Sequence, residues 1–407
     1  MKSVIINNNN TLKLSSLALA LLASSSVNAN VGDDLSSAVK SSKVDVSLRY
    51  RVEAVDQDSL PEEALASTLK SRLTVTTGKV YNFGAQVEVD DVTYLGNDSF
   101  NSTINGNTDH PVVADPEGTE VNQASLSYFG KSYTATAGRQ RINLDDQRFI
   151  GGVAWRQNEQ TFDGYRLQMT PTNKISLDLS YLHNVNRIFG EDNQAKSDLH
   201  GAVALVNAKY KLNKEHAVTA YYYGMEFDSA ATMSNDTIGA TYNGNFPIGD
   251  NKLVLKVGVA SQSDAGDNPN SYDATYSVVD ATVKFDKFSV GAGIETLGSD
   301  NGVGFQTPLA TAHKFQGFSD QFLSTPGDGI QDTYIKGATK LGPVALSAAY
   351  HVFSADDGDA DFGDEINLVA AYKVNKQIST MVKAASYSAD DHNSDTTKLW
   401  FMVSANF

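Results

Sequence analysis

The end of this 407-residue chain alternates between apolar side chains and others, most of them polar, and it finishes on an aromatic residue. Leu399, Phe401, Val403, Ala405 and Phe407 fall on one face of an extended strand, because successive side chains of a strand point to opposite sides. A closing strand with one apolar face is typical of a β-barrel in a membrane, where that face contacts lipid. The pattern alone also fits the last strand of a soluble β-sandwich.

The start of the chain has the pattern of a secretory signal peptide. Lys2 and Lys13 supply positive charge, and residues 14–23 are an apolar run that is too short to span a bilayer. Residues 27–29 (Val-Asn-Ala) form a small-residue cleavage site. We therefore predict a signal peptide over residues 1–29, with a membrane-anchoring helix as the alternative. Residues 30–43 are predicted to be a periplasmic lead-in with at most a helical turn or two.

The composition excludes several classes of protein. The chain has no Cys, which excludes a disulfide framework and a lipid-modified N-terminal Cys. Beyond the signal peptide, no stretch reaches the roughly 18 apolar residues of a membrane-spanning helix. The mean hydropathy of −0.29 is typical of a soluble protein, but barrels distribute their apolar surface in alternation.

From residue 44 onward the hydrophobic pattern has a period of two and is interrupted by Gly, Asn, Asp and Pro clusters. With no break in composition, residues 44–407 are predicted to form one all-β domain, a transmembrane antiparallel up-and-down β-barrel of about 18 strands. The predicted strands cover residues 44–53, 72–76, 81–94, 120–129, 132–142, 160–169, 175–185, 199–211, 216–227, 237–246, 252–262, 274–285, 288–297, 331–341, 344–354, 363–373, 377–388 and 396–407.

The predicted connections alternate between short turns and long polar loops. This is the arrangement of an outer-membrane barrel, and an even number of strands puts both termini on the periplasmic side. A barrel this wide must enclose a lumen. One of the long loops, residues 143–159 or 298–330, is expected to fold inward and set the bore.

All nine Arg residues lie between positions 49 and 187. If Val44, Val46 and Leu48 face lipid, then Arg49 and Arg51 face the lumen, because a charge on the lipid face at mid-bilayer costs about 2–4 kcal/mol. We predict an Arg-lined arc that favours anionic solutes, since guanidinium groups bind carboxylates bidentately. The alternative is that the arginines pair with Glu53, Glu88, Asp90, Asp163 and Asp178 and only brace the wall. The predicted pore-lining residues are Arg49, Arg51, Arg72, Arg139, Arg141, Arg148, Arg156 and Arg166.

Two blocks of sequence resemble the alginate-export family of outer-membrane porins. The first is GRQRI (138–142), DDQRFIG (145–151), WRQN (155–158) and QTFDG (160–164), and the second is HKFQGFSD (313–320) with GDGIQD (327–332). The resemblance implies an 18-stranded barrel whose lumenal arginines guide an acidic polyuronate. By motif match, Arg139, Arg141, Arg148 and Arg156 would be pore residues. Passage of small anions and oligosaccharides fits as well.

The chain shows no catalytic, metal or cofactor site. Its seven His residues form no cluster, and the adjacent carboxylates Asp145 and Asp146 would point apart on a strand. The acidic loop 356–365 has EF-hand-like spacing, but Phe362 occupies the place of the turn Gly. We interpret this loop as solvated, or as a weak divalent bridge to lipopolysaccharide. No phosphate-binding or nucleic-acid-binding pattern appears.

These patterns predict a non-enzymatic porin of the Gram-negative outer membrane that lets small, anionic solutes diffuse passively through its lumen. The expected partners are outer-membrane lipid and lipopolysaccharide, small anionic solutes or oligosaccharides, and the barrel-assembly machinery, which would bind the strand ending at Phe407. The chain could be a monomer or a trimer. Two alternatives stay open: a general trimeric porin of 16 strands, and a barrel that serves mainly as a surface structure.

Overall fold

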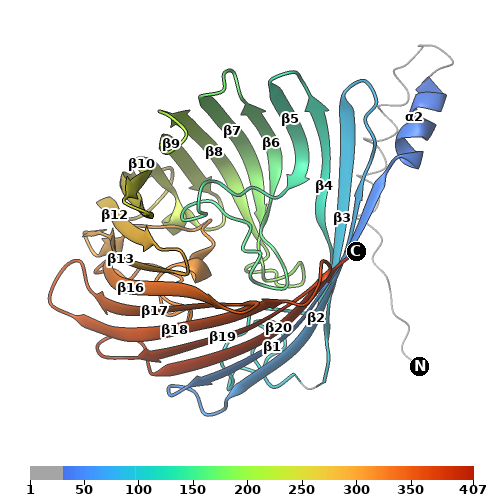
Figure 1. Ribbon diagram of the computed structural model, residues 1–407. Coiled ribbons are helices and arrows are strands. Elements are labelled where there is room, and N and C mark those ends of the chain that lie inside the picture. Colours follow the sequence, from blue (N-terminus) through green and yellow to red (C-terminus); the bar gives the residue numbers. More distant parts are fainter. Residues whose placement is uncertain (1–30, 97) are drawn as a thin grey trace.

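The computed structural model describes residues 31–96 and 98–407, and the predicted signal peptide lies outside them. The described chain forms a closed ring of 18 antiparallel strands, preceded by one helix (Figure 1). The helix is α2 (Val31–Lys40), and the strands of the ring are β1 (Lys43–Gln57), β2 (Ala64–Thr76), β3 (Phe83–Tyr94), β4 (Gly118–Phe129), β5 (Tyr133–Gln140), β6 (Thr161–Met169), β7 (Ile175–Asn186), β8 (Asp198–Lys211), β9 (His216–Phe227), β10 (Asn235–Ile248), β11 (Asn251–Asp264), β12 (Asp273–Lys284), β13 (Phe288–Leu297), β16 (Ile330–Leu341), β17 (Val344–Ser354), β18 (Asp361–Lys373), β19 (Ile378–Ser388) and β20 (Thr396–Asn406).

Each strand of the ring pairs with the strands before and after it, and the last strand closes on the first. β1 and β20 are in register from Ser47 opposite Asn406 to Gln57 opposite Thr396. Beyond the strand end, Phe407 N donates to Val46 O at 2.9 Å. The predicted 18-stranded antiparallel barrel is therefore confirmed, and the 16-stranded alternative is excluded.

Several boundaries differ from the predicted ones, among them those of β2, β5 and the segment before β1. β2 begins at Ala64 rather than at residue 72, because pairing with β1 extends a segment of small side chains whose own strand preference is weak. β5 ends at Gln140, two residues after Gly138, whose φ of +112° turns the chain out of the strand. Residues 31–40 form an α-helix, where at most a helical turn or two was expected.

The two rims of the barrel differ as predicted. Short turns such as residues 249–250 and 342–343 lie on the rim that also carries α2 and the start of β1. Long loops lie on the other rim, and two of them fold inward, not one. Residues 141–160 lie inside the ring of strands in Figure 1, and residues 298–329, which carry β14 (Ser299–Asp300), β15 (Val303–Gly304) and η2 (Ala312–Lys314), pack against them. A short helix, η1 (Ala231–Met233), lies between β9 and β10.

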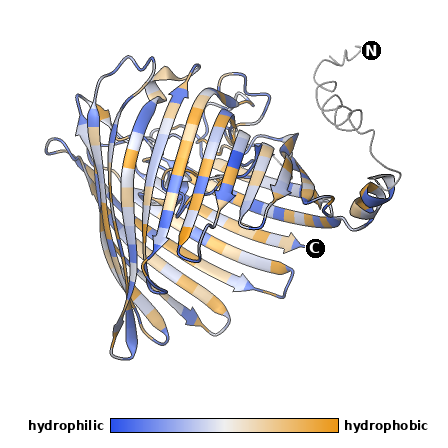
Figure 2. Cartoon of the chain, turned by 90° about the horizontal axis from the view of Figure 1, so that it is seen from above, coloured by the Kyte–Doolittle hydropathy of each residue, from blue (hydrophilic) through white to orange (hydrophobic). Residues whose placement is uncertain are grey.

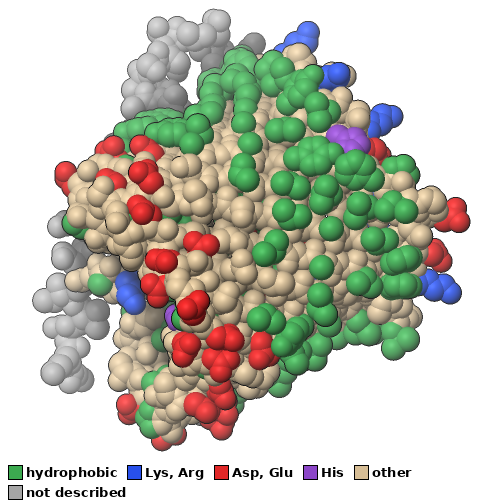
Figure 3. Space-filling model, turned by 90° about the vertical axis from the view of Figure 1, so that its left-hand side faces the viewer, with side chains coloured by type: hydrophobic (Ala, Val, Ile, Leu, Met, Phe, Trp, Pro, Cys, Tyr) green, Lys and Arg blue, Asp and Glu red, His purple; other side chains and the backbone are tan. Residues whose placement is uncertain are grey.

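The side chains that alternate along each strand point by turns to the outer and the inner face of the barrel wall. Along β20, Phe401 is 42% exposed on the outer face, whereas its neighbour Trp400 is fully buried inside. Hydrophobic and hydrophilic residues alternate along the strands in Figure 2. Figure 3 shows hydrophobic side chains covering one side of the wall between charged ends. No helix in the described part of the chain is long and apolar enough to cross a membrane.

The interior contains a hydrophobic core between the inward loops and the wall. The ring of Phe149, on the first inward loop, lies 5.2 Å from the rings of Tyr221 and Tyr276 and 6.0 Å from that of Phe305, on the second loop. Buried Leu309 belongs to the same cluster. The two loops are thus packed parts of the barrel interior.

We expect Phe401→Lys to lower the free energy of unfolding by about 2–4 kcal/mol, because it puts a charge on the lipid face near the middle of the strand. Met402→Lys places the same charge on the inner face beside it and should cost much less. Urea unfolding in lipid vesicles measures both. Equal losses would contradict the assignment of the two faces.

Candidate functional site

The first inward loop, residues 141–160, crosses the lumen and contacts several parts of the wall. It leaves the end of β5, reaches β13 through Arg148, and returns to β1 and β2 through residues 154–159. Gly151 N donates to Leu309 O of the second inward loop at 2.9 Å. Gln160 Nε2 donates to Gly151 O at 2.8 Å and to Leu309 O at 3.1 Å, which fixes the crossing of the two loops.

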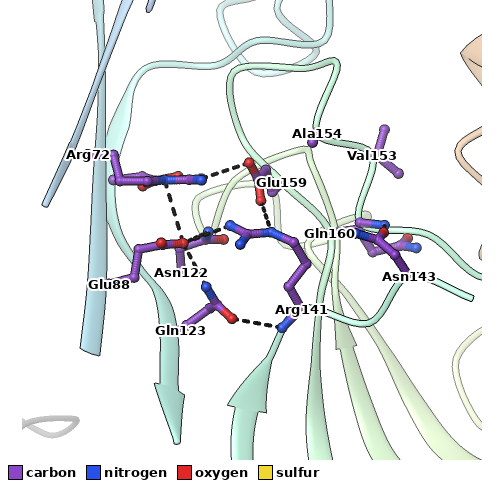
Figure 4. Close-up of polar contacts among 12 residues, drawn as sticks. Arg72, Glu88, Asn122, Gln123, Arg141, Asn143, Val153, Ala154, Glu159 and Gln160 are labelled. Carbon is purple, nitrogen blue, oxygen red and sulfur yellow. Dashed lines mark hydrogen bonds and ion pairs between the residues drawn. The ribbon is translucent and has the colours of Figure 1, made fainter. Parts of the chain in front are cut away.

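Arg72, Arg141, Glu88 and Glu159 form a four-residue charge cluster on the inner wall beside β2 and β3 (Figure 4). Arg72 Nη2 lies 2.9 Å from Glu159 Oε1 and 2.5 Å from Asp90 Oδ2. Arg141 Nη2 lies 2.8 Å from Glu88 Oε1, and its Nε lies 2.5 Å from Glu159 Oε2. Glu159 comes from the loop, so the cluster joins the loop to the wall.

Burial alone would raise the pKa of Glu159, but the cations around it have the larger combined effect. Lys70, Arg141 and Arg72 together lower the pKa of Glu159 to about 2. The carboxylate is therefore ionised throughout the ordinary pH range.

Arg49 and Arg51 bind the backbone of the same loop from strand β1. Arg49 Nη1 donates to Ala154 O at 2.7 Å, and Arg51 Nη1 donates to Trp155 O at 2.6 Å. Arg51 also forms ion pairs with Glu53 and Asp115. Both guanidinium groups face inward as predicted, and each donates to the backbone of residues 154–156.

Arg156 connects the wall to both inward loops. Its Nη1 lies 3.2 Å from Glu53 Oε2 on β1, and its Nη2 lies 2.9 Å from Asp320 Oδ2 on the second loop. Lys398 of β20 also contacts Asp320, at 3.0 Å. All these groups are buried, and we call Glu53, Arg156, His313, Asp320, Lys383 and Lys398 the loop junction.

His313 occupies the centre of the loop junction. Lys383 Nζ donates to its Nε2 at 2.7 Å, and its Nδ1 donates to Asp320 Oδ1 at 2.5 Å. Its ring stacks on Trp155 with centroids 4.3 Å apart. Burial, together with nearby Lys383 and Arg156, lowers the pKa of His313 to about 4 despite the attraction of Asp320, so the imidazole is neutral at neutral pH.

The remaining predicted arginines lie apart from this junction. Arg148 Nε lies 3.0 Å from Glu295 Oε1 of β13, at the far side of the lumen. Arg166 faces the lumen and pairs with Asp178 on the neighbouring strand at 2.6 Å. Arg139 pairs with Asp163, and by register this pair lies on the same side of the sheet as Tyr165, the outer side.

Most of the predicted arginines thus have their donors occupied. Arg49 bonds to loop carbonyls and to an amide, and the other seven each pair with a carboxylate. The five carboxylates considered as bracing partners from sequence are all paired with arginines: Glu53, Glu88, Asp90, Asp163 and Asp178. The geometry favours bracing for these groups, and a solute-guiding role stays a prediction.

Two cavities inside the barrel meet beside the first inward loop. One of about 270 Å³ lies among Phe149, Tyr221 and Lys256, and one of about 560 Å³ lies beside Arg166. Asp145 and Lys209 line both of them. Sequence reasoning missed Lys209, Lys256 and Tyr221, although the alternation through β8 and β9 could have shown that Lys209 and Tyr221 share the inner face.

The described residues contain no group of three or more His, Cys, Asp or Glu that could hold a metal ion. Of the predicted acidic loop 356–365, residues 356–360 connect β17 to β18 and are largely exposed, whereas residues 361–365 belong to β18, where Phe362 and Glu365 are buried. Within residues 31–96 and 98–407, the interior therefore offers charge pairs, aromatic faces and neutral hydrogen-bonding groups to a solute.

The closed barrel, with two inward loops and a charged interior, has the architecture of outer-membrane porins. Residues 41–279 match the family model described as "Alginate export", so the chain belongs to the alginate export family. A comparison with curated protein sequences found no match.

Solved structures share the fold. OccAB4 of Acinetobacter baumannii is 13% identical, with a TM-score of 0.72 over 90% of this chain and 98% of that one. OpdK of Pseudomonas aeruginosa, determined with vanillate, is 13% identical with a TM-score of 0.72, covering 91% and 99%. OccK9 (OpdG) of the same organism is 14% identical with the same TM-score and coverage.

We expect Arg156→Gln to detach the inward loops, because it leaves Glu53 and Asp320 buried with fewer cations. Breaking a buried pair costs about 3–5 kcal/mol. Single-channel recordings should show a larger and noisier conductance, and urea unfolding should show the loss of stability. The control is Arg166→Gln, whose partner Asp178 lies on the wall. A quiet, unchanged conductance in Arg156→Gln would contradict the anchoring role.

The loop junction should weaken as the pH falls from about 6.5 to about 4. His313 binds a proton less readily in the junction than when released, so its folded pKa lies below its ordinary value of 6.5. The stabilisation is complete above pH 6.5 and is lost through this window, because protonated His313 would repel Lys383 and Arg156. Current noise recorded from pH 8 to pH 4 should rise in the wild type. His313→Gln should flatten this dependence, and an identical rise in that variant would exclude His313 as its origin.

Proposed function

We propose that the protein is a solute-selective porin of the Gram-negative outer membrane, exported with a cleaved signal peptide, through which small hydrophilic anions diffuse passively. Uronates and short oligouronates are the preferred solutes in this proposal. The observation that carries it is the narrowing of the lumen by two anchored loops, which leave ring-sized cavities lined by cationic and hydroxyl groups. Membership of the alginate export family supports the choice of carboxylate solutes.

The solute size in this proposal follows from the cavities. A volume of about 270 Å³ suits one sugar or aromatic ring, and about 560 Å³ suits two. OpdK, which shares the fold, was determined with vanillate, a small aromatic carboxylate. We therefore favour small acids over long polymers, and passive diffusion biased by fixed charge over catalysis.

The surroundings of the barrel follow from its outer face. Exposed apolar side chains such as Val46, Tyr165 and Phe401 would contact outer-membrane lipid, and the exposed acidic loops would face lipopolysaccharide. In this proposal the barrel-assembly machinery recognises β20, whose outer face and terminal Phe407 are exposed.

Planar bilayers test the proposal through the reversal potential under a salt gradient and through block by oligouronates. We expect anion selectivity, with block by oligouronates and none by neutral oligosaccharides of the same length. Arg141→Gln should reduce both, because it leaves Glu88 and Glu159 in excess. Arg139→Gln is the matched control, since Arg139 has a similar exposure but lies on the outer side.

Two results would contradict the proposal. Cation selectivity without block would indicate a general porin, and no conductance at all would indicate a barrel that serves as a surface structure. The buried loop junction makes the second outcome worth testing, because the two loops fill much of the extracellular half of the lumen.

A further inference from the structure

Lys209 differs from most of the cations that face the lumen. It lies on the inner face of β8, and no carboxylate of residues 31–96 and 98–407 lies within 4.0 Å of its ammonium group. By contrast, Lys70, Lys256 and Lys336 pair with Glu159, Asp146 and Asp280, respectively. Lys209 is also partly exposed, and it lines both interior cavities.

Neutral residues also line the smaller cavity. Tyr221 is one of them, but it is only 4% exposed and its hydroxyl oxygen is buried, so it contributes its ring rather than its hydroxyl to the cavity. Thr241 and Asn243 of β10 line the same cavity and add neutral donors.

Aromatic faces form the apolar side of this cavity. Phe149 packs against Tyr221 and Tyr276 with ring centroids 5.2 Å apart in both pairs, and Tyr221 stacks on Tyr223 at 5.0 Å. Such faces bind the flat side of a six-membered ring. The cavity thus combines a cation, neutral donors and aromatic rings around about 270 Å³.

We propose that this cavity is a binding site for a monocarboxylate built on a single six-membered ring, with the carboxylate on Lys209 and the ring against Phe149 and Tyr221. The inference rests on the proposed function and locates its selective step. It places that step on the β8–β10 wall. Arg148 also lines this cavity, but its donors are engaged by Glu295 and Gln316.

Asp145 limits the affinity of the site. Its carboxylate lines both cavities beside Lys209, and it accepts a hydrogen bond from Asn207 Nδ2 at 2.7 Å. A bound carboxylate would be repelled by Asp145 while it is attracted by Lys209. Weak binding of this kind suits a channel, because a solute must also leave.

The test measures block of single-channel current by glucuronate and by benzoate, with glucose as the neutral control. Lys209→Gln should weaken block by about tenfold or more, as expected for the loss of a charged hydrogen bond. Asp145→Asn should strengthen it, whereas Lys340→Gln, which removes the same charge at the periplasmic mouth, should leave it unchanged.

Heat-modified mobility on gels reports whether each variant has formed the barrel, and Lys209→Arg restores the charge if Lys209→Gln fails to assemble. Equal block in the wild type and Lys209→Gln, with anion selectivity intact, would overturn the site but not the proposed function. Equal losses in Lys209→Gln and Lys340→Gln would also overturn it, because only long-range charge would then matter. No block of the wild type by either acid, with cation selectivity, would overturn the proposed function as well.

Discussion

The structure depends on the pairing of every strand on both sides, because lipid offers no partner to backbone N–H and C=O groups. The seam between β1 and β20 meets this requirement over its whole length, and Phe407 extends it by pairing with Val46. Once the ring is closed, each side chain of a strand must face either lipid or the interior. Closure therefore converts a period of two in the sequence into a division between an apolar surface and a polar lumen.

The second requirement follows from the first. Charges excluded from the lipid face are confined to the interior, and buried charges are stable only when they are paired and hydrogen-bonded. The wall does not pair all of them alone. Among the described residues, Glu295 pairs only with Arg148 of the first inward loop, and Arg156 of that loop adds a second cation to Glu53 beside Arg51. In return, Glu159 of the first loop binds Arg72 of the wall. Loops and wall thus neutralise each other, which explains why the loops fold into the lumen.

The division between an apolar outer face and a polar lumen also explains what could be predicted from the sequence. Alternation is local, so the number of strands, their faces and the inward direction of Arg49, Arg51, Arg72 and Arg166 could be inferred. The partner of a charge across the lumen leaves no local trace, since Arg156 and Asp320 are 164 positions apart. The kink at Gly138 ends β5 early and separates Arg139 from Arg141, which a regular strand would have kept on one face. Lys209 could not be singled out from the sequence, because its distinguishing feature is that no carboxylate of the described residues lies within 4.0 Å of its ammonium group.

The net charge of −16 is consequently a poor guide to the pore. Much of the acidic excess lies on exposed connections between strands, such as residues 355–360 and 389–395. Figure 3 shows acidic side chains gathered at one end of the side of the barrel that it displays. Exposed charges are screened over about 10 Å at 0.1 M salt, whereas a solute in the lumen touches its neighbours directly. In the interior most charges cancel in pairs. In the proposed function, selectivity is therefore governed by the few groups whose pairing is incomplete, and their positions matter more than the number of charges in the chain.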